Sequence, residues 1–211
     1  TTGTKVFGGA DDDNIQSSGN NTIWGGEGND GITSEGAVGG LIYGEGGDDY
    51  IGAVGTADDT AFGGTGNDII ELSSGDDIGY GDGGHDLIFG DGGRDTLDGG
   101  QGNDTLFGGA DGDTIFGGEG DDVIGGGTDR YIGPQGGRSE WIGEEDGAAD
   151  LLFGGDGFDT FYVGDGDVIA DFNTAMSQKM PENTATVTQI DSVMYGLITL
   201  RASRYTNPIR R

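Results

Sequence analysis

A nine-residue repeat constrains this chain more than any other feature of its sequence. The clearest run covers residues 81–125, where successive segments follow the pattern Gly-Gly-x-Gly-x-Asp-x-U-x, with U an apolar residue. When single-residue insertions and deletions are allowed, the repeat can be followed from Gly8 to about Asp171. Eighteen repeats result, beginning near residues 8, 17, 25, 34, 44, 53, 63, 72, 81, 90, 99, 108, 117, 126, 135, 145, 154 and 163. A period this short predicts a solenoid, because one repeat cannot bury an apolar face by itself.

Two columns of the repeat are nearly constant. The eighth position is mostly Ile or Leu. The sixth position is Asp in 13 of the 18 repeats, namely Asp13, Asp30, Asp49, Asp59, Asp68, Asp77, Asp86, Asp95, Asp104, Asp113, Asp122, Asp150 and Asp159. A compositionally biased random chain would not give this agreement, so disorder is expected only of a metal-free state. Turn formation alone would not require a carboxylate at so many sixth positions.

The alternation within each repeat predicts a tight turn followed by a short strand. Gly accepts the positive φ angles of such turns, and the three residues x-U-x form a strand with U on one face. Stacked turns would then place carboxylates and backbone carbonyls in a row along each edge. Calcium takes six to eight oxygen ligands in tolerant geometry, whereas magnesium retains its waters and zinc prefers nitrogen or sulfur. Calcium is therefore the expected cofactor.

Composition narrows the possible partners. The formal net charge is −30, which argues against nucleic acid and anionic lipid. The chain has no Cys, so it has neither disulfides nor thiolate zinc sites, and no apolar run reaches the ~20 residues of a membrane span. It carries no motif of an active site, and its one histidine, His85, stands at the variable fifth position. We expect a binding module and not an enzyme.

The nonapeptide closely resembles the repeats of the RTX family, the haemolysin-type calcium-binding proteins, over roughly residues 1–171. The resemblance implies an all-β fold, a right-handed parallel β-roll of about eighteen repeats with a C-terminal cap. Two consecutive repeats would form one full turn, so that repeats 18 residues apart stack on the same edge. Each calcium ion would lie between stacked turns, held by sixth-position Asp side chains and by backbone oxygens of positions one to five.

Carried onto this sequence, the resemblance supports about five sites. They lie in the gaps 63/81, 81/99 and 99/117 on one edge, and 72/90 and 90/108 on the other. Besides the aspartates named above, the expected ligands are backbone atoms of Gly63, Gly64, Gly66, Gly81, Gly83, Gly84, Gly90, Gly92, Gly93, Gly99, Gly100, Gly102, Gly108, Gly109, Gly117, Gly118 and Gly120.

Five repeats lack Asp at the sixth position, and in four of them Asn21, Gly40, Tyr131 and Glu140 replace it. Weak or empty sites are expected there, and Tyr131 makes the gap 108/126 doubtful. The segment 130–141 contains two Arg and two aromatic residues and could be an inserted binding loop. Its length equals two degenerate repeats plus one residue, which favours a distorted turn within the roll.

The charge divides the chain near residue 172. Residues 172–211 hold five basic and two acidic residues, a net charge of +3, which leaves −33 for residues 1–171. We therefore predict a β-roll over 1–171 and a flanking cap over 172–211 with short strands at 187–190 and 197–200. The resemblance assigns the closure of the roll to residues 154–172, where the apolar side chains are Phe158, Phe161, Tyr162 and Phe172.

The ninth position carries an aromatic column in alternate repeats. It reads Trp24, Tyr43, Phe62, Tyr80, Asp98, Phe116, Pro134, Phe153 and Asp171. These side chains should point outward, because the eighth points in. They could form a surface for a protein or glycan partner, or they could simply stack along the roll, which is the favoured interpretation.

These observations predict a calcium-binding module of a secreted bacterial protein, outside the cell or at its surface. It would fold on binding calcium and thereby aid export and stability. Two alternatives remain. The chain could be an adhesive module that uses the aromatic column, or it could be the C-terminal appendage of a secreted protease, lipase or polysaccharide-modifying enzyme.

Overall fold

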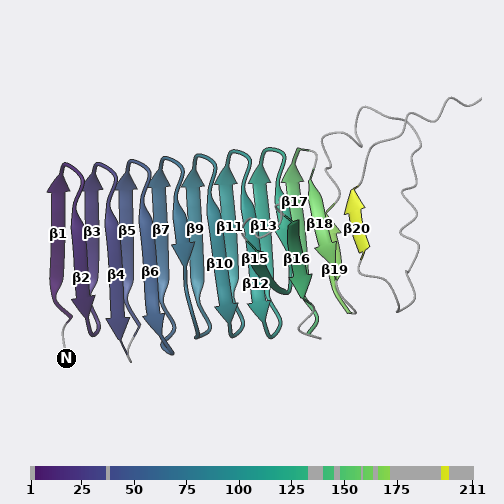
Figure 1. The fold of residues 1–211 in the computed structure, drawn as a ribbon, viewed down its shortest axis with the longest axis horizontal. Helices are drawn as coiled ribbons and strands as arrows, with labels where there is room; N and C mark the ends of the chain where they lie inside the picture. The colour runs from purple at the N-terminus through teal and green to yellow at the C-terminus, as the bar shows by residue number, and fades with distance from the viewer. Residues whose placement is uncertain are drawn as a thin grey trace, which may run out of the picture.

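The computed structural model describes residues 3–36, 39–132, 140–144, 148–157, 159–163, 166–171 and 196–199. Within these ranges all regular structure is β-strand and none is helix. The strands form two sheets that run side by side along one axis, so that the chain winds as a solenoid of about eight turns (Figure 1). The predicted all-β parallel roll is confirmed.

Odd-numbered strands form the first sheet, here called sheet A. In spatial order they are β1 (Lys5–Ala10), β3 (Thr22–Glu27), β5 (Leu41–Gly46), β7 (Thr60–Thr65), β9 (Ile78–Gly83), β11 (Thr96–Gln101), β13 (Thr114–Glu119), β17 (Leu151–Asp156) and β19 (Val168–Asp171). All neighbouring strands of sheet A pair in parallel, and the register shifts once, between β17 and β19.

Sheet B holds the alternate repeats. Its strands are β2 (Asn14–Ser18), β4 (Gly31–Gly36), β6 (Tyr50–Gly55), β8 (Ile69–Glu71), β10 (Leu87–Gly92), β12 (Thr105–Ala110), β14 (Val123–Gly125), β18 (Thr160–Val163) and β20 (Gly196–Thr199). Ile70 pairs with Ile88, and Ile88 with Leu106, so residues 18 apart lie side by side. Two repeats therefore make one turn, as the resemblance implied.

The core is one column of eighth-position side chains from each sheet. Ile23, Ile42, Ile88 and Leu97 are typical and fully buried. In the repeat at 72 the eighth position is Gly79, and the first position is Leu72 instead of Gly. A Cβ added to Gly79 would lie 3.1 Å from Leu72 Cδ1, so Leu72 fills the space that Gly79 leaves. The repeat at 72 thus keeps its core volume by exchanging the two positions.

The sequence interpretation of residues 130–141 as a distorted turn within the roll is wrong. β13 pairs directly with β17, and β14 with β18, so the solenoid passes over this segment. In between, β15 (Thr128–Ile132) and β16 (Glu140–Glu144) form a separate antiparallel hairpin. The length of two degenerate repeats was a coincidence that spacing alone cannot resolve, because strand pairing decides which segments join the stack. The expected repeat at 135, with Glu140 at its sixth position, therefore lies outside the roll.

The inserted hairpin lies against the outer face of sheet B, where β15 contacts β12 (Figure 1). Phe107 stands at an outward-facing ninth position of β12, yet it is only 1% exposed. Its neighbour Phe89, in the same row of sheet B, is half-buried. The core of the roll does not cover an outward side chain, so the hairpin accounts for the burial of Phe107.

At the C-terminal end of the described roll, β20 pairs antiparallel with β18. Phe161 of β18 is 2% exposed and belongs to the core, while Tyr162 is half-buried. Of the two predicted tail strands, the second corresponds to β20, and residues 187–190 lie outside the described ranges. Phe158 and Phe172, the other predicted closing residues, also lie outside them.

The aromatic column is a continuous stack on the outer face of sheet A. It begins one strand before the predicted column, at Phe7, whose ring centroid is 4.6 Å from that of Trp24. The next centroid distances are 5.7, 4.9 and 4.8 Å, through Tyr43 and Phe62 to Tyr80, with interplanar angles of 10 or 11°. Asp98 interrupts the column, which resumes as the Phe116–Phe153 pair, and Pro134 lies outside the described ranges. Because the rings cover one another's faces, the favoured stacking interpretation holds for these residues.

We expect this stack to stabilise the roll measurably. Replacing Phe62 by Ala removes two ring pairs, and because each pair contributes about 0.5–1.5 kcal/mol, the loss should be about 1–3 kcal/mol. Phe7→Ala is the matched control, because Phe7 has one stacked neighbour in the column and is 65% exposed. Urea unfolding of both variants with calcium present measures the difference, and equal losses would contradict this account.

Candidate metal centre

The sixth-position aspartates form two rows, one along each edge where the sheets meet. The first row, edge 1, contains Asp13, Asp30, Asp49, Asp68, Asp86, Asp104, Asp122 and Asp159. The second row, edge 2, contains Asp59, Asp77, Asp95, Asp113, Asp150 and Asp167. Among the predicted thirteen, all except Asp13 are buried. The structure thus brings every predicted aspartate into one of two rows.

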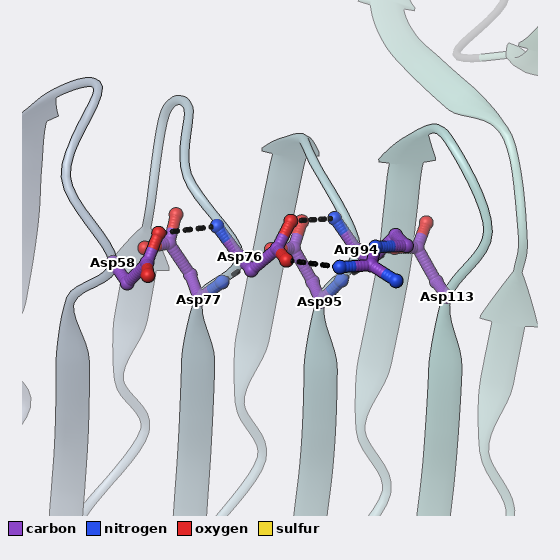
Figure 2. Close-up of polar contacts among 6 residues, drawn as sticks. All are labelled: Asp58, Asp76, Asp77, Arg94, Asp95 and Asp113. Carbon is purple, nitrogen blue, oxygen red and sulfur yellow. Dashed lines mark hydrogen bonds and ion pairs between the residues drawn. The ribbon is translucent and has the colours of Figure 1, made fainter.

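In the rows beyond Asp13, one carboxylate oxygen of each aspartate accepts a backbone N–H from the neighbouring turn. The backbone N–H of Asp68 donates to Asp86 Oδ1, and that of Asp86 to Asp104 Oδ1, both at 2.8 Å. On edge 2 the N–H of Asp77 donates to Asp95 Oδ1 at 2.8 Å in the same manner. Figure 2 shows this edge, with Asp77, Asp95 and Asp113 following one another along the sheet. These bonds link each turn to the next.

The second carboxylate oxygen is the feature that points to a ligand. Burial of an anionic oxygen without a donor is strongly unfavourable. Yet in the following residues Oδ2 is buried and accepts no hydrogen bond from the protein: Asp30, Asp49, Asp68, Asp77, Asp86, Asp95, Asp104 and Asp122. A row of such atoms requires a positive partner, and a cation in each gap between turns would supply it.

The first-position glycines leave room for that cation. A Cβ placed on Gly81 would overlap Asp86 Oδ2 and the carbonyl oxygen of Gly99 in the next turn. In the same gap, the carbonyl oxygens of Asp82 and Gly84 face the following turn. The gap 81/99 is therefore lined by carboxylate and carbonyl oxygens, and the absence of a first-position side chain keeps it open.

The fourth position is where glycine is required by its backbone conformation. Gly102 has φ +129°, and a Cβ there would overlap the carbonyl oxygen of Gly84. Only glycine adopts this conformation without strain while letting the carbonyl approach so closely. The second position is less demanding, because Asp82 and Asp91 hold left-handed φ angles of +70° and +69° there.

The donor set matches calcium among the common divalent ions. The described part of the chain contains no group of three or more His, Cys, Asp or Glu side chains that could hold a metal ion. The gaps between turns offer Asp carboxylates and backbone carbonyls, an oxygen-only set. Calcium accepts such sets at coordination numbers of six to eight, whereas zinc does not prefer them. A bound ion would supply positive charge to a buried, strongly acidic row.

Burial shifts the acidity of these carboxyls. Desolvation is the main cause that raises the pKa of Asp77, Asp86 and Asp122 to about 7, with neighbouring aspartates adding to it. The same cause raises the pKa of Asp68 and Asp95 to about 6, against partial opposition from backbone N–H donors. Without a metal, these carboxyls therefore begin to take up protons at about pH 6–7, far above the ordinary range of aspartate.

The first half of edge 2 is built differently. At the sixth position of the repeat at 17, Asn21 Nδ2 donates to Ser17 Oγ at 2.6 Å and to the Ser18 carbonyl oxygen at 3.0 Å. The amide thus satisfies oxygens that face the gap, in the place where a cation would otherwise be needed. Gly40 has no side chain, and its N–H donates to Asp59 Oδ1. These arrangements agree with the weak or empty sites expected at Asn21 and Gly40.

The gap 72/90 differs from the other predicted sites. Its turn has Leu72 in place of the first-position glycine, and Leu72 is fully buried in the core. The carboxylates of Asp77 and Asp95 are nevertheless present on either side. The gap has the aspartates of a site without the first-position glycine, a departure that the count of sixth-position Asp residues did not take into account.

Sequence reasoning missed some residues of the rows. Asp167 accepts the N–H of Asp150 at 3.1 Å and so continues edge 2, although a one-residue deletion places it at the fifth position of the assigned repeat. Gly8, Gly25, Gly44 and Gly154 provide the same open first position as Gly81. The four glycines begin assigned repeats, so applying the ligand pattern to every repeat would have included them, and one further deletion in the last repeat would have found Asp167.

The fifth position forms an outer ladder beside each row. The N–H of Asp76 donates to Asp58 Oδ1, and the N–H of Arg94 donates to Asp76 Oδ1, both at 3.0 Å (Figure 2). On the other edge His85 Nδ1 accepts the N–H of Asn103 at 2.7 Å, so its proton is on Nε2. His85 thus serves as a hydrogen-bond acceptor like the neighbouring Asp and Asn side chains, whereas the guanidinium of Arg94 pairs with Asp76.

A parallel β-solenoid with rows of buried aspartates and glycine-lined gaps defines a metal-binding repeat protein. The family model of the RTX calcium-binding nonapeptide repeat matches residues 7–36, 54–88, 89–124, 98–132 and 146–167, which together exceed half of the chain. The chain belongs to this family of calcium-binding repeats. No curated protein matches it in a sequence comparison. None of the described residues forms a helix long and apolar enough to cross a membrane.

Proposed function

We propose that this chain is a calcium-triggered folding module of a secreted protein. The observation that carries the proposal is the series of buried Oδ2 atoms that accept no hydrogen bond from the protein. A fold that buries many uncompensated carboxylate oxygens is unstable until a cation occupies the gaps. Calcium binding then contributes free energy to the folded state alone.

The rest of the chain offers little to offset that cost. It contains 50 Gly among 211 residues, and each glycine loses much conformational freedom on folding. The inner core receives about one eighth-position side chain per nine residues, and the net charge of −30 opposes compaction. Folding should therefore be coupled to calcium and cooperative along the stack, because each turn contacts only its neighbours.

This coupling suits export from a cell. In a cytosol poor in calcium the chain would remain extended and able to pass through a channel, and it would fold after emerging into higher calcium. We propose an extracellular or cell-surface location on this basis, together with the family assignment. The proposed role is binding and stabilisation, not catalysis, because the buried aspartates are used in the two rows.

The adhesive alternative would use the aromatic column. Its rings cover one another's faces, so a sugar could stack fully only on a terminal ring such as Phe7. Edge contacts with a protein partner remain open along Trp24, Tyr43, Phe62 and Tyr80. An enzyme appendage would have the same calcium-dependent fold, so this alternative concerns the parent protein and leaves the proposed role unchanged.

Far-UV circular dichroism during a calcium titration tests the proposal. We expect a coil in chelator and a cooperative transition to β structure as calcium rises, with no comparable transition in magnesium. A β-solenoid already folded in chelator at neutral pH would contradict the proposed trigger.

A further inference from the structure

The inserted hairpin interrupts a turn of the roll, and the two halves of that turn rejoin. Gly126 occupies the first position, because its carbonyl oxygen accepts the N–H of Gly109 at 2.8 Å. The chain then leaves through β15 and β16 and returns at Ala148. Asp150 takes the sixth position, where spacing had placed Tyr131.

The rejoined turn has the geometry of an uninterrupted one. The N–H of Asp113 donates to Asp150 Oδ1 at 2.8 Å, and the N–H of Leu151 to the Asp113 carbonyl oxygen at 2.8 Å. A Cβ on Gly126 would overlap Asp150 Oδ2, as in the gap 81/99. Asp113 and Asp150 are 2% and 3% exposed. The gap 108/126, doubtful from the sequence, therefore acquires its aspartate across the insertion.

Edge 1 is also continuous across the insertion, and it contains a buried carboxylate oxygen that accepts no hydrogen bond from the protein. The N–H of Asp122 donates to Asp159 Oδ1 at 3.1 Å, although the two residues are 37 apart in sequence. Asp122 is 1% exposed, and its Oδ2 accepts no hydrogen bond from the protein. A Cβ on Gly117 would overlap Asp122 Oδ2 and approach the Gly154 carbonyl oxygen. This gap, 117/154, thus has the same open space and unmatched oxygen as the regular sites.

We propose that two calcium sites bracket the insertion and hold the hairpin in place. One is the split site of Gly126, Asp113 and Asp150 on edge 2, and the other lies between Asp122 and Asp159 on edge 1. The inference rests on the proposed binding of calcium by the roll, and it adds sites that join segments on either side of the hairpin.

Calcium in these two sites would hold the hairpin against the surface of sheet B. Gly126 and Asp150 lie at the two ends of the excursion, so an ion held by both fixes the distance between its ends. With its base fixed, the hairpin lies on β12 and covers Phe107. Loss of either ion should loosen the hairpin and expose Phe107 before the rest of the roll is affected.

Three substitutions test the bracketing sites. D150N and D122N each remove one charge while keeping an oxygen that can accept the N–H of the preceding turn. D68N is the matched control, because Asp68 lies in the same row as Asp122 but several turns from the hairpin. Calcium bound per chain is counted by native mass spectrometry, and hydrogen exchange is followed for amides of residues 128–132 and 140–144.

We expect each variant to bind one ion fewer than the parent chain. Exchange of the hairpin amides should accelerate at least tenfold in D150N and D122N, and should be unchanged in D68N. An unchanged ion count in D150N and D122N, with one ion lost in D68N, would overturn the bracketing sites and leave the proposed function intact. A parent chain that binds no calcium would overturn both. Equal hairpin exchange in all three variants would also refute the inference.

A shortened chain covers the case in which these variants do not fold. Replacing residues 128–148 by two glycines creates a turn that reads Gly-Gly-Gly-Gly-Ala-Asp-Leu-Leu-Phe, a regular nonapeptide. This chain should fold with calcium and bind as many ions as the parent, because the split site does not need the hairpin. Loss of an ion on shortening would contradict the inference.

Discussion

Without calcium, the chain is expected to gain β structure when the pH is lowered from about 8 to about 5. The carboxyls of Asp49, Asp68 and Asp95 have their pKa raised to about 6 in the fold, and those of Asp77 and Asp86 to about 7. In each case burial is the largest cause. Protonation neutralises the charge that otherwise calls for a metal ion, so acid should partly substitute for calcium.

The direction of this pH dependence follows from proton linkage. The unfolded aspartate has a pKa near the ordinary value of 3.8, so between about pH 4 and 7 the folded state binds more protons than the unfolded state. Stability of the metal-free fold therefore rises as the pH falls through the folded pKa values, and the gain is complete near pH 4. Above about pH 7 this contribution is absent.

Circular dichroism in chelator across this pH range measures the effect. The control is the same titration at saturating calcium, where acid should destabilise the fold because protons compete with the ion for the same carboxylates. A metal-free chain that remains a coil down to pH 5 would show that the aspartate rows are not what prevents folding.

Replacing Asp86 by Asn should change stability in opposite directions with and without calcium. In chelator at pH 8, D86N removes a buried charge and should stabilise the fold. With calcium it removes a carboxylate from the middle of edge 1, where Asp86 Oδ2 faces the gap 81/99. One lost site costs about 2.7 kcal/mol when free calcium is 100 times its dissociation constant.

D98N is the matched control for this prediction. Asp98 also carries a raised pKa from burial, but it stands in the aromatic column on the outer face of sheet A and belongs to neither row. The change in charge is identical, so D98N should leave the calcium midpoint close to that of the parent. Urea unfolding measures the change in stability under both conditions, in calcium and in chelator at pH 8. Sulfate is added to the chelator sample if it is needed to populate the fold. A loss of stability by D86N under both conditions would indicate a purely structural role for Asp86.

Much of the fold was accessible to sequence reasoning because the solenoid is nearly one-dimensional. A contact such as Ile88 with Leu106 follows from the period once two repeats are known to form a turn. The same arithmetic aligned Asp68, Asp86 and Asp104 in one row. The residue types within one repeat and the spacing between repeats thus predict the same contacts, and no long-range information was needed to place these residues.

The exceptions arise where spacing allows two arrangements. The exchange between Leu72 and Gly79 depends on which side chains share a volume, and residues 130–141 could have been repeats or an insertion. Asn21 shows a third case, since its amide meets the oxygens that an aspartate would leave to a metal. Each of these outcomes depends on contacts between turns, which a pattern within one repeat does not contain.

By itself, therefore, the sequence determined the period, the sheet-forming residues, the two aspartate rows and the preference for an oxygen-binding cation. Only the tertiary structure decided that Asp150 completes the turn begun by Gly126, and that the hairpin between them covers Phe107. The physical reason is that periodicity records which residues repeat, whereas strand pairing and burial select which of the candidate segments join the stack.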